Sequence, residues 1–370
     1  MVSRARTHVY VIDGTMSRLA LGEETNAGLL YKLVEELGPR RDQTVGYHPG
    51  VQSEGLGKWI RIAAGVGINL AIIEGYATLA SRYRPGDAIM LFGFSRGAYA
   101  VRSLAGFIAN IGLVRQNEAT ERMIARAFRL YETPGSAADD FRARHCHDHV
   151  PIAFLGVWDT VKALGLPYPL LSRLAPMASE FHDEGLAPEV ENAFQALALD
   201  EDRAAYTPMP WRVAPDWEGR GEQMWFAGAH ADVGGHVYDA PASRPLSNIP
   251  LRWMIEHAAA CGLILPNGWQ TRYPVDPLAP AKGNRRGHAR LFWDRAPRVI
   301  GACSSEAVHA SVAERMRGPG GYLPRAREAG EAEVTAGAAV EAEAEGVSES
   351  GAGLSLPPSA PRSLGRSRGG

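Results

Sequence analysis

A serine flanked by glycines constrains the fold of this chain more than any other feature. Residues 93–97 have the sequence Gly-Phe-Ser-Arg-Gly; they follow the apolar run 88–92 and precede a stretch with the apolar spacing of a helix. Glycine two positions before and two positions after Ser95 permits a sharp turn without a Cβ clash. A strand, a tight turn at serine and a helix are the context of a nucleophile elbow. The alternative is that Ser95 only caps the helix.

Apolar runs that alternate with amphipathic stretches predict the fold class. Strands are expected at 8–12, 88–92, 152–158 and 223–227, with a further one at 289–293. Helices are expected at 29–37, 59–83, 118–131, 190–199 and 251–260. Short, mostly apolar strands are typical of a sheet that is buried on both faces, and their alternation with helices favours parallel pairing. We therefore expect an α/β fold, α/β-hydrolase-like, with a mostly parallel sheet and helices on both faces.

Composition divides the 370 residues into one large domain and a tail. Residues 8–324 hold the predicted elements and form the expected α/β-hydrolase-like catalytic domain, in which the Pro- and Leu-rich stretch 164–177 is an ordered loop or cap. Residues 325–370 contain no aromatic side chain and are rich in Ala, Glu, Gly and Ser. Such a segment buries too little apolar area to offset its ordering entropy, so we expect a disordered tail.

Charge, cysteine content and hydropathy exclude several classes of protein. A formal net charge of −2 offers no basic surface to nucleic acid, and three widely spaced cysteines argue against a disulfide scaffold. The apolar run at 8–12 is too short for a signal-peptide core, and the stretch 62–73 is too short to span a bilayer. We expect a cytoplasmic protein without Sec-type export. Export by a non-Sec machine and transient contact with a membrane surface stay open.

Side chains at the carboxyl ends of the predicted strands supply partners for Ser95. Near neutral pH a serine hydroxyl needs a base to take its proton, and the base needs an acid to hold its tautomer. Asp159 follows the strand at 152–158, and His230 follows the strand at 223–227. The order Ser, Asp, His along the chain is that of α/β hydrolases. We assign Ser95 as the nucleophile, His230 as the general base and acid, and Asp159 as the carboxylate that orients His230.

A second arrangement of acid and base stays open. Asp232 lies two residues after His230, and it would pair with the later imidazole of His309. Placement at the strand ends favours the first arrangement. The structural alternatives are that His230 is satisfied within a turn and that Asp159 is an N-cap.

The first predicted strand ends in Asp13-Gly14-Thr15, which has more than one interpretation. Gly14 or Thr15 is a candidate donor in an oxyanion hole, with the N–H of Arg96 as the other donor. A simple β-turn is the alternative. Asp-Gly-Thr after an apolar strand also ends the motif of aspartate-based phosphatases. That motif needs a nucleophilic aspartate two places earlier, where this chain has Val11, so a phosphoaspartate mechanism is disfavoured.

The segment 144–149, Arg-His-Cys-His-Asp-His, has the composition of a metal-binding tract. Alternating histidines on an extended chain share one face, which suits a surface loop equally well. The sequence has no second ligand cluster at metal spacing, so we assign no metal site. No cofactor is expected either.

Nine stretches of the chain, in order along residues 8–324, carry a resemblance to a known family. They lie at 13–15, 24–26, 83–87, 92–99, 156–161, 196–201, 225–235, 249–254 and 309–312. Through them the chain resembles the catalytic domain of type VI secretion phospholipase effectors, an α/β-hydrolase family. It departs from the family's usual residues at Met16, Gln195 and His236, where Trp, His and Gly are common.

The resemblance implies a bacterial serine hydrolase that acts on carboxylic esters or lipids in a phospholipase-like reaction. The family's Ser-Asp-His triad falls on Ser95, Asp159 and His230, in agreement with the assignment from strand ends. The implied substrate is a lipid or another ester, and the sequence identifies no protein partner. The alternative is a catalytically silent interaction module that keeps the hydrolase scaffold.

Overall fold

The computed structural model describes residues 5–50, 66–133, 135–161, 185–285 and 294–328. By its internal contacts the chain divides into two units, Met1–Arg327 and Glu328–Gly370, and the central sheet lies in the first. Within the described residues, no helix has both the length and the apolar character that a bilayer crossing requires.

The described residues form a seven-stranded sheet in which every pairing is parallel. The order across the sheet is β2-β1-β3-β4-β5-β6-β8. Its strands are β1 (Thr7–Ile12), β2 (Gln43–His48), β3 (Ala88–Phe94), β4 (Ile152–Trp158), β5 (Asn192–Ala198), β6 (Arg220–Phe226) and β8 (Glu306–Val308). Two short strands, β7 (Val299–Ile300) and β9 (Arg327–Glu328), pair separately. The predicted α/β class with a mostly parallel sheet is confirmed.

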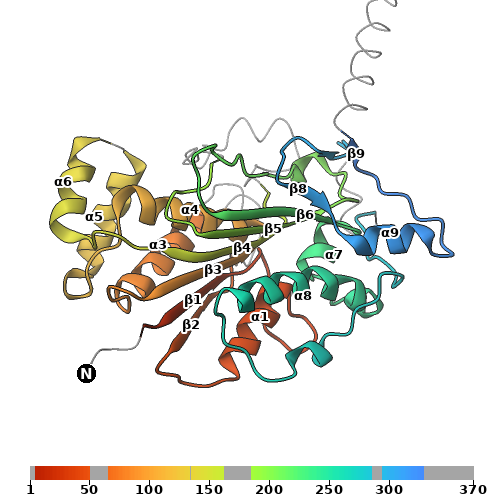
Figure 1. Ribbon diagram of the computed structural model, residues 1–370, viewed down its shortest axis with the longest axis horizontal. Helices are drawn as coiled ribbons and strands as arrows, with labels where there is room; N and C mark the ends of the chain where they lie inside the picture. The colour runs from red at the N-terminus through yellow and green to blue at the C-terminus, as the bar shows by residue number, and fades with distance from the viewer. Residues whose placement is uncertain (1–4, 51–65, 134, 162–184, 286–293, 329–370) are drawn as a thin grey trace, which may run out of the picture. The chain divides into compact units, whose positions relative to one another are not determined.

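Helices cover both faces of this sheet (Figure 1). On one face lie α3 (Val66–Ala80), α4 (Arg96–Ile111), α5 (Glu121–Glu132) and α6 (Ser136–His145). On the other lie α1 (Asn26–Glu35) and α8 (Arg244–Ala260). The short α7 (His230–Gly234) follows β6, and α9 (Ala310–Arg317) follows β8. Parallel strands need long crossover connections, and these helices supply them.

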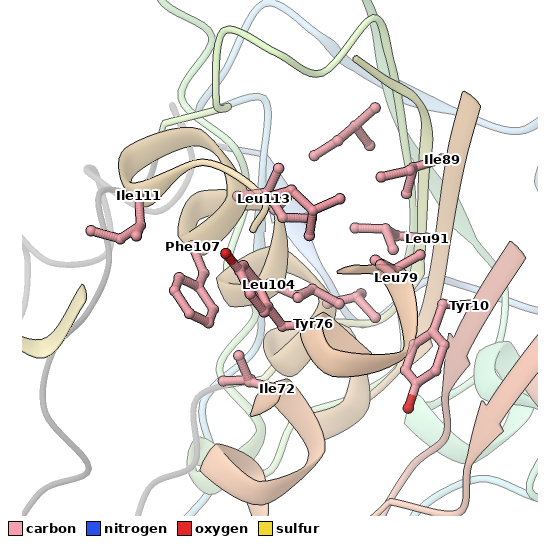
Figure 2. Packing of buried hydrophobic residues seen from close by; sticks show 14 of the residues in the cluster. Tyr10, Ile72, Tyr76, Leu79, Ile89, Leu91, Leu104, Phe107, Ile111 and Leu113 are labelled. Atoms are coloured by element: carbon pink, nitrogen blue, oxygen red, sulfur yellow. The ribbon is translucent and has the colours of Figure 1, made fainter. Parts of the chain in front are cut away.

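Apolar side chains from alternate strand positions enter two separate cores. In β1, Tyr10 and Ile12 pack under α3 and α4, whereas Val9 and Val11 pack under α1 and α8. Figure 2 shows the first core, where the rings of Tyr76 and Phe107 are stacked with centroids 4.1 Å apart. Burial on both faces explains why the strands are apolar almost throughout.

One predicted helix is wrong: residues 190–199 contain strand β5 instead. Its Ala and Leu residues have high helix propensity. Six of the seven positions in β5 are nevertheless buried, because the strand lies between β4 and β6 in the sheet. Burial between two neighbouring strands therefore overrides local propensity here.

Besides β5, two further strands of the sheet, β2 and β8, were not predicted, and both lie at its edges. Most residues of β2 are only partly buried, and β8 has three residues, so neither strand has the apolar run that marked the central strands. The predicted strand at 289–293, the loop or cap at 164–177 and the first part of the predicted helix 59–83 lie outside the described residues.

The strand order creates one topological switch point, and it determines where the site lies. The chain leaves β1 to pair β2 on one side and later returns to pair β3 on the other side of β1. In open parallel sheets the crevice forms at the carboxyl ends of the strands where the order reverses. Asp13 directly follows β1, and Ser95 directly follows β3, so both residues lie at the carboxyl ends of the two strands that define this switch point.

Candidate active site

Ser95 lies in a tight turn between β3 and α4, with φ of 59° and ψ of −122°. Non-glycine residues rarely adopt a positive φ. A Cβ on Gly93 would lie 2.5 Å from the carbonyl oxygen of Gly97, and a Cβ on Gly97 would lie 2.2 Å from the carbonyl oxygen of Ile12. Glycine is therefore required at both positions, because α4 begins directly against the ends of β3 and β1.

A continuous chain of hydrogen bonds joins three of the predicted side chains. Nε2 of His230 lies 2.9 Å from Oγ of Ser95, and Nδ1 of His230 lies 2.6 Å from Oδ2 of Asp159. All three residues are buried, and Asp159 is completely so. Ser95 follows β3, Asp159 follows β4, and His230 begins α7 after β6. These strands are far apart in sequence, but their carboxyl ends lie at the same edge of the parallel sheet.

Neighbouring groups hold the imidazole of His230 from several sides. The rings of Phe94 and Tyr206 lie against it, with centroids 4.8 Å and 4.9 Å away. The backbone N–H of His230 donates to Oε2 of Glu201 at 3.2 Å. Glu201 in turn forms a two-bond ion pair with Arg203, with both donor–acceptor distances at 2.7 Å. The position of His230 is thus fixed through its ring and its backbone.

Asp159 has a second partner besides His230, the buried guanidinium of Arg298. Nη1 of Arg298 lies 2.6 Å from Oδ1 of Asp159, and Nη2 lies 2.9 Å from Oδ2. Oδ1 also accepts the backbone N–H of Ala198 at 3.0 Å. Burial raises the pKa of Asp159, but the charge of Arg298 and the hydrogen bond with His230 outweigh it, so the pKa lies below its ordinary value. The carboxylate is therefore ionised.

The three candidate oxyanion-hole residues differ in whether they have a free hydrogen-bond donor. Arg96 is the first residue of α4, so its N–H has no acceptor within the helix. The N–H of Gly14 is already engaged, since it donates to Oδ1 of Asp13 at 2.7 Å. The hydroxyl of Thr15 is buried and has no hydrogen-bond partner in the described structure. Arg96 and Thr15 therefore remain available as donors.

Asp13 is the completely buried carboxylate that orders this loop. Besides the N–H of Gly14, it accepts the hydroxyl of Thr25 at 2.7 Å and the hydroxyl of Tyr47 at 2.8 Å. Burial raises the pKa of Asp13, and these hydrogen bonds oppose the rise. Asp13 therefore connects the end of β1 to α1 and β2 and fixes the loop that carries Thr15.

The alternative pair, Asp232 and His309, is engaged elsewhere. Asp232 accepts three backbone N–H groups, from Ala229 at 2.9 Å, Lys282 at 2.7 Å and Gly283 at 3.0 Å. Nδ1 of His309 accepts the N–H of Ser311 at the start of α9, and its ring stacks on Phe226. Both side chains thus serve local structure in α7 and α9.

The histidine-rich segment 144–149 lies at the end of α6. Nδ1 of His145 is 2.6 Å from the carboxylate of Glu118, and the ring of His147 packs edge-on against Tyr83. Cys146 is buried, and burial raises the pKa of its thiol to about 12. In the described part of the chain, no three His, Cys, Asp or Glu side chains gather where they could hold a metal ion.

Sequence analysis missed two groups beside the chain of Ser95, His230 and Asp159. Glu201 ends the stretch 196–201, which is one of those that resemble the family, but nothing in that stretch indicates a contact with the backbone of His230. Arg298 stands in the sequence Arg-Ala-Pro-Arg-Val-Ile at 295–300, which resembles no motif. Only the three-dimensional structure brings Arg298 to the end of β4.

Comparisons with known proteins concern both sequence and fold. A family model for the catalytic domain of Tle1-like phospholipase effectors of the T6SS matches residues 6–257. A protein of Saccharomyces cerevisiae, described as uncharacterized protein YEL023C, is 29% identical over 242 residues, which cover 56% of this chain and 34% of that protein. The chain thus spans about a third of the length of this relative.

Two solved structures are similar over 74% of this chain. One is an uncharacterized protein from Pseudomonas aeruginosa, with 17% identity, a TM-score of 0.42 and 49% of that chain covered. The other is the Tle1 effector bound to the VgrG spike from the type 6 secretion system, with 16% identity, a TM-score of 0.46 and 77% of that chain covered.

The family match includes the elements that carry the hydrogen-bonded chain. Ser95, Asp159 and His230 all fall within residues 6–257, whereas Arg298 lies beyond them. The matched range is well over half of the sequence. The chain therefore belongs to the family of Tle1-like phospholipase effector catalytic domains of the type VI secretion system.

Proposed function

We propose that this protein is a serine hydrolase that cleaves carboxylic esters of lipids through an acyl-enzyme. Ser95 is the nucleophile, His230 the general base and acid, and Asp159 the carboxylate that orients the imidazole. The observation that carries the proposal is the unbroken hydrogen-bond chain, with 2.9 Å between Ser95 Oγ and His230 Nε2 and 2.6 Å between His230 Nδ1 and Asp159 Oδ2. Such a chain is how an unreactive hydroxyl is activated near neutral pH.

In the first half-reaction, Oγ of Ser95 attacks the carbonyl carbon of the ester while its proton passes to Nε2 of His230. The electron pair of the C=O bond moves to oxygen, which gives a tetrahedral oxyanion. The carbonyl then re-forms, the bond to the leaving alcohol oxygen breaks, and His230 returns the proton to that oxygen. In the second half-reaction, water repeats these steps on the acyl-enzyme and releases the fatty acid.

Charge develops at two places during this reaction, and the surrounding groups match both. The imidazolium that forms on His230 faces the ionised carboxylate of Asp159. The oxyanion forms beside the start of α4, where the N–H of Arg96 is available. We assign the hydroxyl of Thr15 as the second donor, because it is buried without a partner. Fixed donors aimed at a developing oxyanion are a large term in acyl-transfer catalysis.

The lipid nature of the ester rests on membership of a phospholipase effector family. The triad geometry by itself would serve any carboxylic ester. We extend the proposal from the family to delivery by a type VI secretion system. Hydrolysis of phospholipid vesicles, with the released fatty acids identified by mass spectrometry, tests the lipid part separately from the serine chemistry.

The serine chemistry is tested with Ser95→Ala. We expect hydrolysis of short-chain aryl esters to fall by about 10³-fold or more, because the nucleophile is lost. A fluorophosphonate probe should label the wild type and leave the variant unlabelled, while thermal melting shows that both are folded. Folded wild-type protein that neither hydrolyses esters nor reacts with the probe would contradict the proposal and support a silent interaction module.

A further inference from the structure

We propose that Arg298 is a positioning residue of this site, which fixes the Asp159 carboxylate and, through it, the imidazole of His230. The inference rests on the proposed function, because it assigns a role beside the Ser95–His230–Asp159 chain. It goes beyond the family match, since Arg298 lies outside residues 6–257. Arg298 does not touch the reacting atoms, so it acts through Asp159.

The geometry of Arg298 is that of a clamp on the carboxylate. Its two terminal nitrogens meet the two oxygens of Asp159, at 2.6 Å and 2.9 Å. The same nitrogens donate to the carbonyl oxygens of Ala198 at 3.0 Å and Tyr206 at 2.7 Å. Arg298 is only 4% exposed. A two-bond Arg–carboxylate pair fixes the carboxylate plane, and that plane decides where Oδ2 meets His230.

The charge of Arg298 has a second effect, on Asp159. Oδ2 of Asp159 is shared between Nη2 of Arg298 and Nδ1 of His230. Burial raises the pKa of Asp159, but the charge of Arg298 outweighs burial and keeps that pKa below its ordinary value. Asp159 therefore stays an ionised acceptor for Nδ1 of His230, which leaves Nε2 to face Ser95.

The other charged groups near His230 do not hold the Asp159 carboxylate in place. Glu201, beneath the backbone of His230, forms an ion pair with Arg203 instead. Among the described residues, Arg298 is the arginine that forms an ion pair with Asp159.

The segment that carries Arg298 is anchored to the sheet at several points. Gln223 in β6 donates its N–H to Ser305 at 2.9 Å, and His309 donates its N–H to Trp225 at 3.0 Å. Strand β8 pairs with β6 in parallel. Residues 294–328 therefore complete the site, and the catalytic unit is longer than the matched family domain.

The test compares Arg298→Gln and Arg298→Lys with the wild type in the full chain. Arg298→Gln removes the charge, whereas Arg298→Lys keeps it and removes the two-bond fork. Arg295→Met is the matched control, because Arg295 pairs with Asp202 in the same segment, away from Asp159. The measurements are kcat and KM for aryl-ester hydrolysis and, in a Ser95→Ala background, the ¹⁵N chemical shifts of the His230 ring, which report which ring nitrogen carries the proton.

For Arg298→Gln we expect kcat to fall by about 100-fold or more while KM changes little, and the His230 ring to show a mixture of tautomers, because Asp159 is no longer fixed against Nδ1. For Arg298→Lys we expect a smaller fall in kcat, by about 10-fold, because the charge stays while the two-bond fork is lost. Arg295→Met should leave both readouts unchanged.

Wild-type kcat in Arg298→Lys, or an unchanged His230 tautomer in Arg298→Gln, overturns the inference. If Arg298→Gln does not fold, Arg298→Lys still decides through kcat. The NMR spectrum needs no turnover, so a changed tautomer in a protein without esterase activity would sink the proposed function and leave the role of Arg298 intact. An unchanged tautomer in an active enzyme would do the reverse.

Discussion

At the scale of the residue, Asp159 is a carboxylate with both charged and backbone partners. It is completely buried, has a positive φ of 44° and accepts hydrogen bonds from His230, Arg298 and Ala198. The lowered pKa of Asp159 also affects how the free energy of unfolding depends on pH. Folding favours the ionised form, so the contribution of Asp159 is present above the ordinary carboxyl pKa and is lost as pH falls below it.

The corresponding prediction concerns acid stability. Wild-type protein should lose free energy of unfolding progressively below about pH 5, whereas Asp159→Asn, which cannot titrate there, should lose less over the same range. The variant starts from a lower stability at pH 7, because Arg298 is left with a neutral partner. Urea unfolding of both proteins between pH 7 and pH 3 measures the difference. Two curves that decline in parallel would show that Asp159 does not titrate as described.

At this scale the sequence singles out residues that follow strand ends, but it gives no sign of Arg298, which directly follows none of the predicted strands. Ser95 and Asp159 stand directly after β3 and β4, and His230 follows β6 after a short turn, so their places at strand ends indicate that they lie close together. Arg298 precedes the short strand β7 and contacts Asp159 through tertiary packing only. No local pattern marks an arginine whose partner follows a strand far away in the sequence.

At the scale of the element, the packing of α4 against β1 depends on a missing side chain. A Cβ on Gly97 would lie 2.2 Å from the carbonyl oxygen of Ile12 and 2.3 Å from that of Asp13. These are backbone atoms of a central strand, which cannot move aside. The helix therefore starts where it does because residue 97 is glycine.

We predict that Gly97→Ala prevents α4 from docking and yields little folded protein, with destabilisation of more than about 4 kcal/mol. Gly106→Ala on the same helix is the control, because the nearest atom to its Cβ would be the Tyr131 hydroxyl at 3.3 Å. That change should alter stability by no more than about 1 kcal/mol, as helix propensity favours alanine. Soluble yield and thermal unfolding compare the two. Similar melting temperatures would refute the packing argument.

The sheet shows which elements a sequence can and cannot specify. The central strands β1, β3, β4 and β6 were predicted, because burial on both faces leaves continuous apolar runs. Strand β5 was mistaken for a helix, since its Ala- and Leu-rich sequence matches helix propensity while its neighbours in the sheet lie far away in sequence. Edge strand β2 lacks the apolar run because most of its residues are partly exposed.

At the scale of the whole molecule, the functional unit extends past the matched family range. The family model ends at residue 257, but β8, α9 and Arg298 follow it and bond to β6 and Asp159. The contacts of the chain divide at residue 327, where the first unit ends.

A pair of truncations tests where the functional unit ends. A chain that stops at residue 328 should keep its esterase activity and its stability to within about 0.5 kcal/mol, because it retains the central sheet and Arg298. A chain that stops at residue 293 loses β8, α9 and Arg298 and should fail in both respects. Activity lost from the longer chain would place essential residues after 328.

The unusual backbone conformation at Ser95 has a consequence for the thermal stability of this protein. Ser95 occupies φ and ψ values that glycine adopts freely and serine does not, so the native state carries a conformational penalty at the proposed nucleophile. Replacing Ser95 with glycine should raise the melting temperature while abolishing the proposed turnover. Selection for thermal stability alone would therefore favour glycine at this position, and the proposed need for a reactive hydroxyl opposes that change.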